Sequence, residues 1–239
     1  MPAYNAERTI SKSVHSIINQ DFEDWVLYII NDCSKDNTLE VISKFNDERI
    51  ILKSNSNNMG VAYSRNVGLE EAQCGDRVFF IDSDDVWEST KLRLQIDALN
   101  KHNIVCTDYF YVGNSKNEVK SHLEKISAMN FLKKKFRVCF SSLGYNVNDQ
   151  NVNLRFKNTG HEDFVFINSL LNFKEKIYCL PITLVEMYKI EGSLSSNKKK
   201  AIKWHYNNLK EIFPNNSLKV GVYMFFYIFN GFVFSRKNR

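Results

Sequence analysis

Several features that mark other protein classes are scarce or missing in this chain of 239 residues. Only 3 prolines and 9 glycines are present, which excludes collagen-like and Pro/Gly-rich disordered proteins. The 5 cysteines form no C-x-x-C pair, so the sequence predicts neither a zinc site nor a disulfide framework. No G-x-G-x-x-G turn and no P-loop follow an apolar run, which argues against a dinucleotide-dependent oxidoreductase.

Long apolar runs are also missing. The longest spans residues 220–234 and is interrupted by two glycines and an asparagine, whereas a membrane-spanning helix needs roughly 20 apolar residues. The first residues do not show the basic and apolar regions of a secretory signal. Unpaired cysteines are typical of a reducing compartment. We therefore expect a cytoplasmic protein without a transmembrane helix.

Acidic residues are nearly absent from the C-terminal end. Residues 198–239 hold nine Lys and Arg against the single acid Glu211, a net of +8, whereas the whole chain carries +5. Because this charge does not form a stripe on the folded body, no nucleic-acid partner is predicted. Basic and apolar residues together instead predict peripheral contact with an anionic membrane, at the inner face of the cytoplasmic membrane. The alternatives are a solvated, charged terminus and a helix that packs on the folded body or on a second copy of it.

What the sequence does contain is a regular alternation of helix and strand patterns. Apolar spacing predicts helices over residues 7–20, 38–46, 61–72 and 88–102 and strands over residues 25–30, 49–52, 78–81 and 104–112. This alternation predicts an α/β protein with a mostly parallel, Rossmann-like sheet flanked by helices. The later pattern is less regular: a hairpin after residue 112, strand fragments and a mobile loop over 136–158, a helix over 162–173, and strands over 177–180 and 183–188.

Three carboxylates follow the apolar strand pattern that ends at residue 81. They are Asp82, Asp84 and Asp85, with Ser83 between the first two. Like charges this close are costly unless a cation or hydrogen-bond donors compensate them. Two carboxylates that leave positions for water and phosphate oxygens suit Mg²⁺ or Mn²⁺. The alternative is a helix N-terminus, at which Ser83 or Asp84 caps the helix that follows.

Asp32 also follows a predicted buried strand. Ligands of parallel sheets gather beyond the carboxyl ends of the strands, so this carboxylate can accept hydrogen bonds from a nucleobase or a ribose. A turn-forming role is the alternative, because aspartate is common in strand-to-helix loops.

Taken together, these segments resemble the family 2 glycosyltransferases of GT-A fold in order and spacing. The segments that carry the resemblance are Met1 to Glu7, Ile30 to Thr38, Asn58-Met59-Gly60, Ser64 to Gly68 and Phe80 to Trp87. Two later segments are similar to family motifs: Gly160-His161-Glu162-Asp163-Phe164 to the E-D motif, and Tyr188-Lys189-Ile190 with Ser193, Ser195 and Lys198 to a motif that follows it. The resemblance implies a GT-A domain over residues 1–197, with a nucleotide-sugar half at 1–102 and a smaller mixed acceptor half at 103–197. A helical tail over 198–239 follows.

The resemblance implies a metal-dependent, inverting hexosyltransferase. Sugar would pass from a nucleoside diphosphate sugar, with a UDP-sugar as first choice, to a hydroxyl of a surface polysaccharide or lipid-linked oligosaccharide. Asp82 and Asp84 would hold Mn²⁺ or Mg²⁺ against the donor diphosphate, and Ser83 would lie against the ribose. Asp163 would be the general base that takes the acceptor proton.

The same resemblance assigns three further donor-binding residues. Asp32 would read the nucleobase, Tyr4 would pack against it, and Arg65 would support the diphosphate or the acidic loop. For Arg65, a structural ion pair beneath the site is the alternative. His161 has no partner at metal-ligand spacing and is predicted to be an ordinary polar loop residue.

Two departures from the family pattern bear on function. Asn31 stands where the family commonly has the first of two aspartates. The family also runs an apolar strand immediately before the segment that starts at Pro2, so the sequence predicts that this first, central strand is missing. The alternative function is therefore an N-terminally truncated, non-catalytic remnant that binds nucleotide weakly or not at all.

Overall fold

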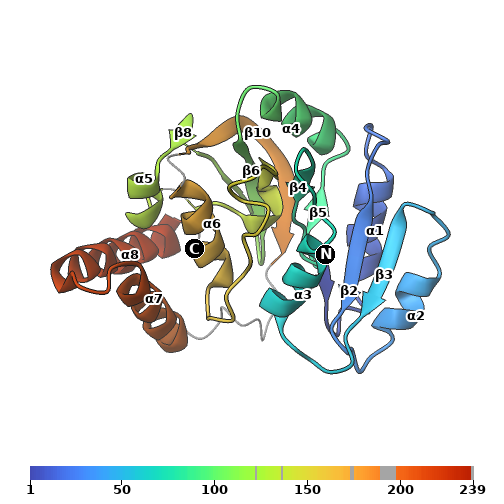
Figure 1. Ribbon diagram of the computed structural model, residues 1–239, viewed down its shortest axis with the longest axis horizontal. Coiled ribbons are helices and arrows are strands. Elements are labelled where there is room, and N and C mark those ends of the chain that lie inside the picture. The colour runs from blue at the N-terminus through green and yellow to red at the C-terminus, as the bar shows by residue number, and fades with distance from the viewer. Residues whose placement is uncertain (122, 136, 173–174, 189–197, 238–239) are drawn as a thin grey trace.

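The architecture is an α/β fold built on two neighbouring sheets, shown in Figure 1. A computed structural model describes residues 1–121, 123–135, 137–172, 175–188 and 198–237. Of the later family-like segment, residues 189–197 lie outside the described residues, whereas Tyr188 and Lys198 are described.

The first sheet is wholly parallel, as the alternation of helices and strands predicts. Its order is β1 (Pro2–Ala3), β2 (Leu27–Asn31) and β3 (Ile50–Ser54). Its helices are α1 (Ile10–Ile18), α2 (Thr38–Ser43) and α3 (Val61–Leu69). Ile10, Val14 and Ile17 recur on one face of α1 and are buried, which fixes that helix against the sheet.

The second sheet is mixed and carries the longest strands. Its members are β4 (Arg77–Phe79), β5 (Val86–Trp87), β6 (Ile104–Val112), β7 (Lys116–Val119), β8 (Lys125–Ile126), β9 (Gly144–Asn146) and β10 (Ile177–Tyr188). Strands β6 and β10 are parallel, whereas β9 runs antiparallel to both β4 and β6, and β5 runs antiparallel to β10. The mixed sheet is the larger of the two and takes β4 and β5 from before residue 102, so the predicted boundary at residue 102 does not separate the two sheets.

Strand β1 is short and follows the position at which the sequence predicts a missing strand. It has two residues, Pro2 and Ala3, which pair with Ile30 and Asn31 of β2. The amino group of Met1 extends this pairing by donating a 2.8 Å hydrogen bond to the carbonyl of Tyr28. Among the described residues, no ladder joins β1 to the second sheet.

The remaining helices surround the second sheet. They are α4 (Lys91–Leu99), α5 (Ala128–Leu132), the 3₁₀ turn η1 (Phe140–Ser142), α6 (Glu162–Leu171), α7 (Lys198–Ile212) and α8 (Ser217–Lys237). Every helix and strand predicted before residue 113 is found, with ends that differ by a few residues.

The segment over residues 136–158, predicted to be strand fragments and a mobile loop, contributes to the core instead. Phe140, Tyr145 and Phe156 are buried in it, and the rings of Phe156 and Phe166 stack at a centroid distance of 4.1 Å. The many Asn and Ser residues of this segment indicate a loop, although each of these aromatic residues buries a large apolar area. Among the described residues of this segment, only the short strand β9 matches the predicted strand fragments, and residues 140–142 form the 3₁₀ turn η1 instead.

The tail packs against the body through α7 and one side of α8. Leu209 and Val220 are buried in the same cluster as Phe164 and Phe166 of α6. Within the described part of the chain, no helix combines the length and apolar character needed to cross a membrane. The contacts of α7 therefore support the alternative in which the tail packs on the folded body. Helix α8 packs there too, but it also has exposed apolar side chains.

Candidate active site

The acidic loop between β4 and β5 brings three carboxylates together. Asp82, Asp84 and Asp85 each offer an oxygen atom, and these atoms lie within 4.8 Å of one another. Burial and the neighbouring charge of Asp82 raise the pKa of Asp84 to about 6. Burial, followed by the charges of Asp82 and Asp84, raises the pKa of Asp85 well above its ordinary value. A group of this kind is destabilised without a positive charge beside it.

Ser141 holds the acidic loop from the neighbouring turn η1. Its hydroxyl donates to Asp85 and accepts a 3.1 Å hydrogen bond from the backbone N–H of Asp82. The backbone N–H of Tyr188, at the end of β10, donates to the other oxygen of Asp85 at 3.2 Å. Asp85 therefore fixes the loop, and Asp82 and Asp84 remain the more exposed pair.

Arg65 joins the acidic loop to the start of α6. Its guanidinium donates at 2.7 Å to Asp82 and at 2.7 Å to Glu162, and the side chain is 5% exposed. Burial lowers the pKa of Arg65, but the charges of Asp82 and Glu162 outweigh it and the pKa is raised overall. This is the ion pair that the sequence leaves as one of two alternatives for Arg65.

The predicted base lies at the first turn of α6. The carboxylate of Asp163 accepts a 2.7 Å hydrogen bond from the backbone N–H of Phe164, in the position where a helix favours negative charge. Burial and the charge of Asp163 raise the pKa of Glu162, against the opposing charge of Arg65. His161 precedes them in a left-handed conformation with φ 58°.

Asp32 is buried at the end of β2 and ties a loop to the sheet. Its carboxylate accepts from the side chain of Asn55 at 2.7 Å and from the backbone N–H groups of Met59 and Gly60 at 2.9 and 2.8 Å. Tyr4, after β1, is 46% exposed. The turn-forming role left open for Asp32 is therefore present, and base recognition by Asp32 and Tyr4 stays a prediction.

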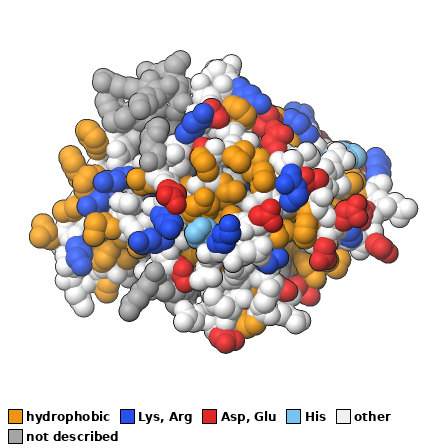
Figure 2. Space-filling model, turned by 90° about the horizontal axis from the view of Figure 1, so that it is seen from above, with side chains coloured by type: hydrophobic (Ala, Val, Ile, Leu, Met, Phe, Trp, Pro, Cys, Tyr) orange, Lys and Arg blue, Asp and Glu red, His pale blue; other side chains and the backbone are white. Residues whose placement is uncertain are grey.

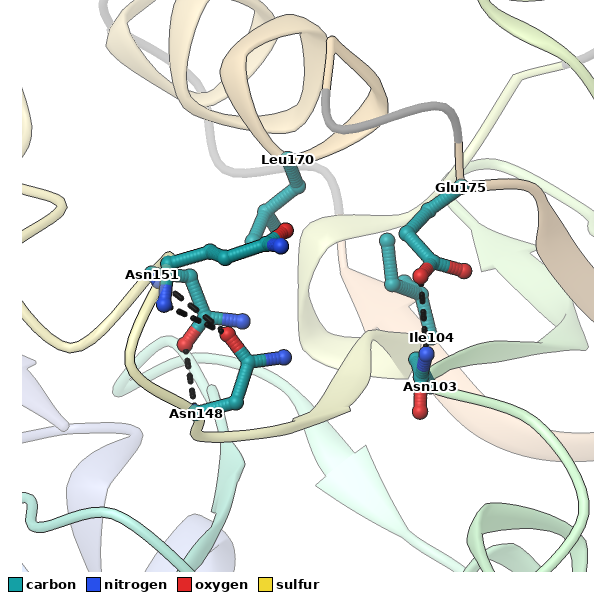
Figure 3. Close-up of a pocket in the computed structure, with 7 residues that line it drawn as sticks. Asn103, Ile104, Asn148, Asn151, Leu170 and Glu175 are labelled. Carbon is teal, nitrogen blue, oxygen red and sulfur yellow. Dashed lines mark hydrogen bonds between the residues drawn. The ribbon is translucent and has the colours of Figure 1, made fainter.

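A small cavity lies at the other end of the second sheet. Figure 3 shows Asn103 and Ile104 at the start of β6, with Glu175 and Leu170 nearby. Its volume of about 10 Å³ suits roughly one water molecule. Ligands of α/β sheets bind at the carboxyl ends of strands, and this cavity lies at the amino ends. It is therefore not the active site.

Comparison with known proteins decides the family. The model of "Glycosyl transferase family 2" matches residues 1–158. A glycosyltransferase of Haemophilus influenzae is 31% identical over 248 residues, which cover 99% of this chain and 96% of that protein. The chain belongs to glycosyl transferase family 2.

Further family members show what such proteins act on. The Escherichia coli protein WfgD, a UDP-Glc:α-D-GlcNAc-diphosphoundecaprenol β-1,3-glucosyltransferase, is 43% identical over 104 residues, covering 44% of this chain and 41% of WfgD. The crystal structure of Staphylococcus aureus TarS with UDP-GlcNAc is similar with a TM-score of 0.72 at 21% identity. That match covers 88% of this chain and 64% of the TarS chain.

A second similar structure contains a bound metal ion. The mannosyltransferase PcManGT of Pyrobaculum calidifontis, in complex with GDP-Man and Mn²⁺, is similar with a TM-score of 0.68 at 15% identity. The match covers 93% of this chain and 68% of that one. At these identities the likeness confirms the GT-A fold, whereas the roles of individual residues remain to be argued from the site itself.

The sequence of this family 2 member reveals some of its site residues and not others. The acidic loop and the E-D motif are clusters of acids, visible in the sequence, and Arg65 brings them together. Ser141 is missed, because nothing in its local sequence distinguishes it from its neighbour Ser142. Its role arises from a contact with Asp85, 56 positions away.

Proposed function

We propose that this protein is a metal-dependent, inverting hexosyltransferase that moves a sugar from a UDP-sugar to a hydroxyl of a lipid-linked oligosaccharide or surface polysaccharide. One observation carries the proposal: Arg65 binds both Asp82 of the acidic loop and Glu162 of the E-D motif. This bridge joins the acidic loop to the segment that carries the predicted base Asp163, whose charge also acts on Arg65, and so supports one site for metal and base.

The acidic loop fits a divalent cation. Its carboxylate oxygens converge within 4.8 Å, and burial raises the pKa of Asp84 to about 6, which a bound cation would reverse. Asp82 and Asp84 would be the ligands, since Asp85 is already bound by Ser141 and Tyr188. A Mn²⁺ or Mg²⁺ ion bound there would neutralise charge on the departing diphosphate.

The protein residues would position donor and acceptor. Ser83 would lie against the ribose, Tyr4 would stack on the base, and Asp32 would recognise the base directly or through the loop that it holds. Asp163 would accept the proton of the acceptor hydroxyl as that oxygen attacks the anomeric carbon from the face opposite the leaving diphosphate. Attack from that face inverts the anomeric configuration.

Loss of Asp84 tests the metal site. In Asp84→Ala, transfer of glucose from UDP-glucose should fall by orders of magnitude and lose its response to added Mn²⁺, because one ligand of the cation is gone. Asp97→Ala, an exposed acid on α4, is the matched control. Full activity of the parent in excess chelator would contradict the metal assignment. Absence of both nucleotide binding and transfer in the parent would favour the non-catalytic alternative.

Loss of Asp163 tests the base. Asp163→Asn keeps the shape of the side chain and should retain binding of UDP and Mn²⁺ while turnover is lost, because only the proton acceptor is removed. Titration calorimetry measures the binding and radiolabelled transfer the turnover. A variant that binds donor and still turns over at the parent rate would exclude Asp163.

The outer side of α8 supports docking at the inner face of the cytoplasmic membrane. Leu218, Val222, Phe225 and Phe229 follow one another at steps of four, three and four positions, so they form one ridge along the helix, and all are exposed. One basic residue packs on a neighbouring face of α8, with the ammonium of Lys133 5.6 Å from the ring of Phe226. In Figure 2, apolar and basic side chains interleave at the end of the molecule where Figure 1 places α7 and α8.

A vesicle assay tests this docking. The parent should sediment with phosphatidylglycerol vesicles at low salt and less with phosphatidylcholine, because the basic residues add about 1 kcal/mol each near anionic lipid. Phe225→Ser/Phe229→Ser should stay in the supernatant. Val26→Ser/Ile182→Ser, which changes exposed apolar residues on other elements, is the control. Equal sedimentation of both double variants would exclude the ridge as the membrane contact.

A further inference from the structure

Helix α7 touches the chain just before the predicted catalytic acids. Asn208 is buried, and its side-chain amide donates a 2.7 Å hydrogen bond to the carbonyl of Gly160. Gly160 lies three positions before Asp163. The contact spans 48 positions of sequence, so it ties the tail directly to the E-D motif.

Trp204, one turn earlier on α7, packs against the same glycine. A Cβ atom placed on Gly160 would lie 1.9 Å from the indole ring of Trp204, which no side chain can occupy. The φ angle of Gly160 lies outside the left-handed range, so this position needs glycine for space rather than for backbone freedom. Asn208 and Trp204 therefore hold Gly160 by a hydrogen bond and by close packing.

His161, the next residue, is held in an unfavourable conformation. Its φ of 58° and ψ of 48° are left-handed, a conformation that is unfavourable for a non-glycine residue. Such a conformation persists only where surrounding contacts impose it. The imidazole ring of His161 lies 5.8 Å from the ring of Trp204 and 6.1 Å from that of His205. Residues of α7 thus flank the strained position.

Stacked aromatic rings extend the contact between α7 and α6 beyond His161. His205 of α7 lies 4.6 Å from Phe164 of α6 and stacks on Tyr227 of α8 at 3.9 Å. Phe164 is the residue whose N–H donates to the carboxylate of Asp163. The first turn of α6 is therefore fixed by its own hydrogen bond and by α7 and α8 together.

We propose that α7 is a positioning element for the catalytic base, with Asn208 and Trp204 as positioning residues. By holding Gly160 they impose the left-handed turn at His161, and this turn sets the start of α6 and the direction of the Asp163 carboxylate. The inference rests on the proposed function, in which Asp163 is the base. Small displacements of a reacting group cost on the order of 100-fold in rate, so weak contacts at this loop have large kinetic effects.

The first experiment compares neighbouring asparagines. Asn208→Ala should lower kcat about tenfold or more while the KM for UDP-glucose changes less than about twofold, because none of the proposed donor-binding residues lies on α7. Asn207→Ala, the same change at the adjacent exposed position, should leave both constants unchanged. A purely structural role for Asn208 would lower the melting temperature and scale kcat with the folded fraction. That result, or an unchanged kcat, would overturn the proposal.

The second experiment uses the close contact at Gly160. Gly160→Ala should lower kcat strongly, because the new methyl group collides with Trp204. In a Trp204→Ala background the same change should cost almost nothing, because the ring that it strikes is absent. This non-additivity identifies a direct interaction. Equal effects of Gly160→Ala in both backgrounds would show that Trp204 does not restrain the loop.

Hydrogen exchange separates this inference from the proposed function. In Asn208→Ala, the amides of Phe164 and Val165 should exchange at least about tenfold faster than in the parent, whereas amides in the middle of β6 should be unchanged. This readout needs no enzymatic activity. A parent without transferase activity would contradict the proposed function alone, while unchanged exchange at residues 161–165 would contradict the positioning role alone.

Discussion

Arg65 shows how a single buried side chain organises two acidic segments. Its two terminal nitrogens bind Asp82 and Glu162, and its guanidinium carbon lies 4.5 Å from the centre of the Phe140 ring. The planar fork of arginine suits this arrangement, because it directs separate N–H groups at two carboxylates. The remaining Nε has no partner among the described residues, so the charge depends on those two carboxylates.

Arg65→Lys should be far from conservative. A single ammonium cannot reach both carboxylates, and the partly buried carboxylate left unpaired should lower the free energy of unfolding by about 1–3 kcal/mol. Urea titration followed by circular dichroism measures this change. Arg93→Lys, at an exposed ion pair with Asp21, should change it by less than about 1 kcal/mol. Equal effects at the two positions would mean that Arg65 is not an essential bridge.

Residue-scale prediction from sequence succeeds where the chemistry is local. Three acids within four positions are visible without a structure, and so is the Glu162-Asp163 pair. The partners of these acids are not visible. Ser141 approaches Asp85 from 56 positions away, and Asn55 approaches Asp32 across 23 positions, so only the folded chain reveals them. Whether the named residues bind donor and metal stays a prediction.

At the scale of elements, two glycines differ in the space around them. Gly144 of β9 faces Phe79 of β4, the strand that leads into the acidic loop, and a Cβ atom there would lie 2.5 Å from the ring. Gly68 in α3 is different, because a Cβ atom there would meet Ile30 at an ordinary 3.6 Å. The first glycine is required for strand pairing, whereas the second only weakens its helix.

Substitution of these glycines should have opposite effects. Gly68→Ala should stabilise the protein by about 0.5–1 kcal/mol, because alanine restricts the unfolded chain and favours the helix. Gly144→Ala should destabilise it by about 1–3 kcal/mol, since Phe79 must shift. Thermal unfolding of both variants at one pH checks the signs. A stabilising Gly144→Ala would show that β4 and β9 are not packed as described.

Elements could be predicted where periodicity is strong. All eight helices and strands predicted before residue 113 exist, because buried strands and one-sided helices leave clear patterns. Strands β5 and β8 have two residues each, too few for any period to appear. Strand β10 was predicted as two strands, since Pro181 interrupts it. The structure keeps one strand, with register shifts on either side of Thr183.

At the scale of the molecule, the tail and the body share one apolar core. Leu209 of α7 and Val220 of α8 lie in the cluster that contains Phe164 and Phe166. The predicted boundary between residues 1–197 and a tail over 198–239 therefore does not divide the core. We expect that the two parts do not unfold independently. Elements that share a core usually unfold in one cooperative step.

Fluorine NMR can test this cooperativity in one sample. A protein labelled with 5-fluorotryptophan should lose the native signals of Trp87, beside the acidic loop, and of Trp204, on α7, at the same urea concentration. The shared core makes loss of one region costly for the other. Substitution of each tryptophan by phenylalanine assigns the signals. An earlier midpoint for Trp204 would show that the tail unfolds separately.

The whole molecule should also lose stability in mild acid because of one buried histidine. Burial, and to a smaller degree the charges of Lys134 and His161, lower the pKa of His205 to about 2. Neither ring nitrogen of His205 has a hydrogen-bond partner among the described residues. The ring therefore stays neutral where it joins α6, α7 and α8. In the unfolded chain its pKa returns to about 6.5.

The sign of the effect follows from proton counting. Below about pH 6.5 the unfolded chain binds a proton that the folded chain does not. The free energy of unfolding should therefore fall by about 1.4 kcal/mol for each unit by which the pH is lowered. The stability that depends on the neutral His205 ring is fully present above that pH, and about 2 kcal/mol of it is lost by pH 5. His205→Phe keeps an apolar ring in the layer and should flatten this dependence between pH 7 and pH 5. The control His15→Phe, at an exposed position on α1, should retain the slope of the parent. Urea unfolding at four pH values measures the slopes, and equal slopes for parent and His205→Phe would mean that protonation of other groups limits stability in acid.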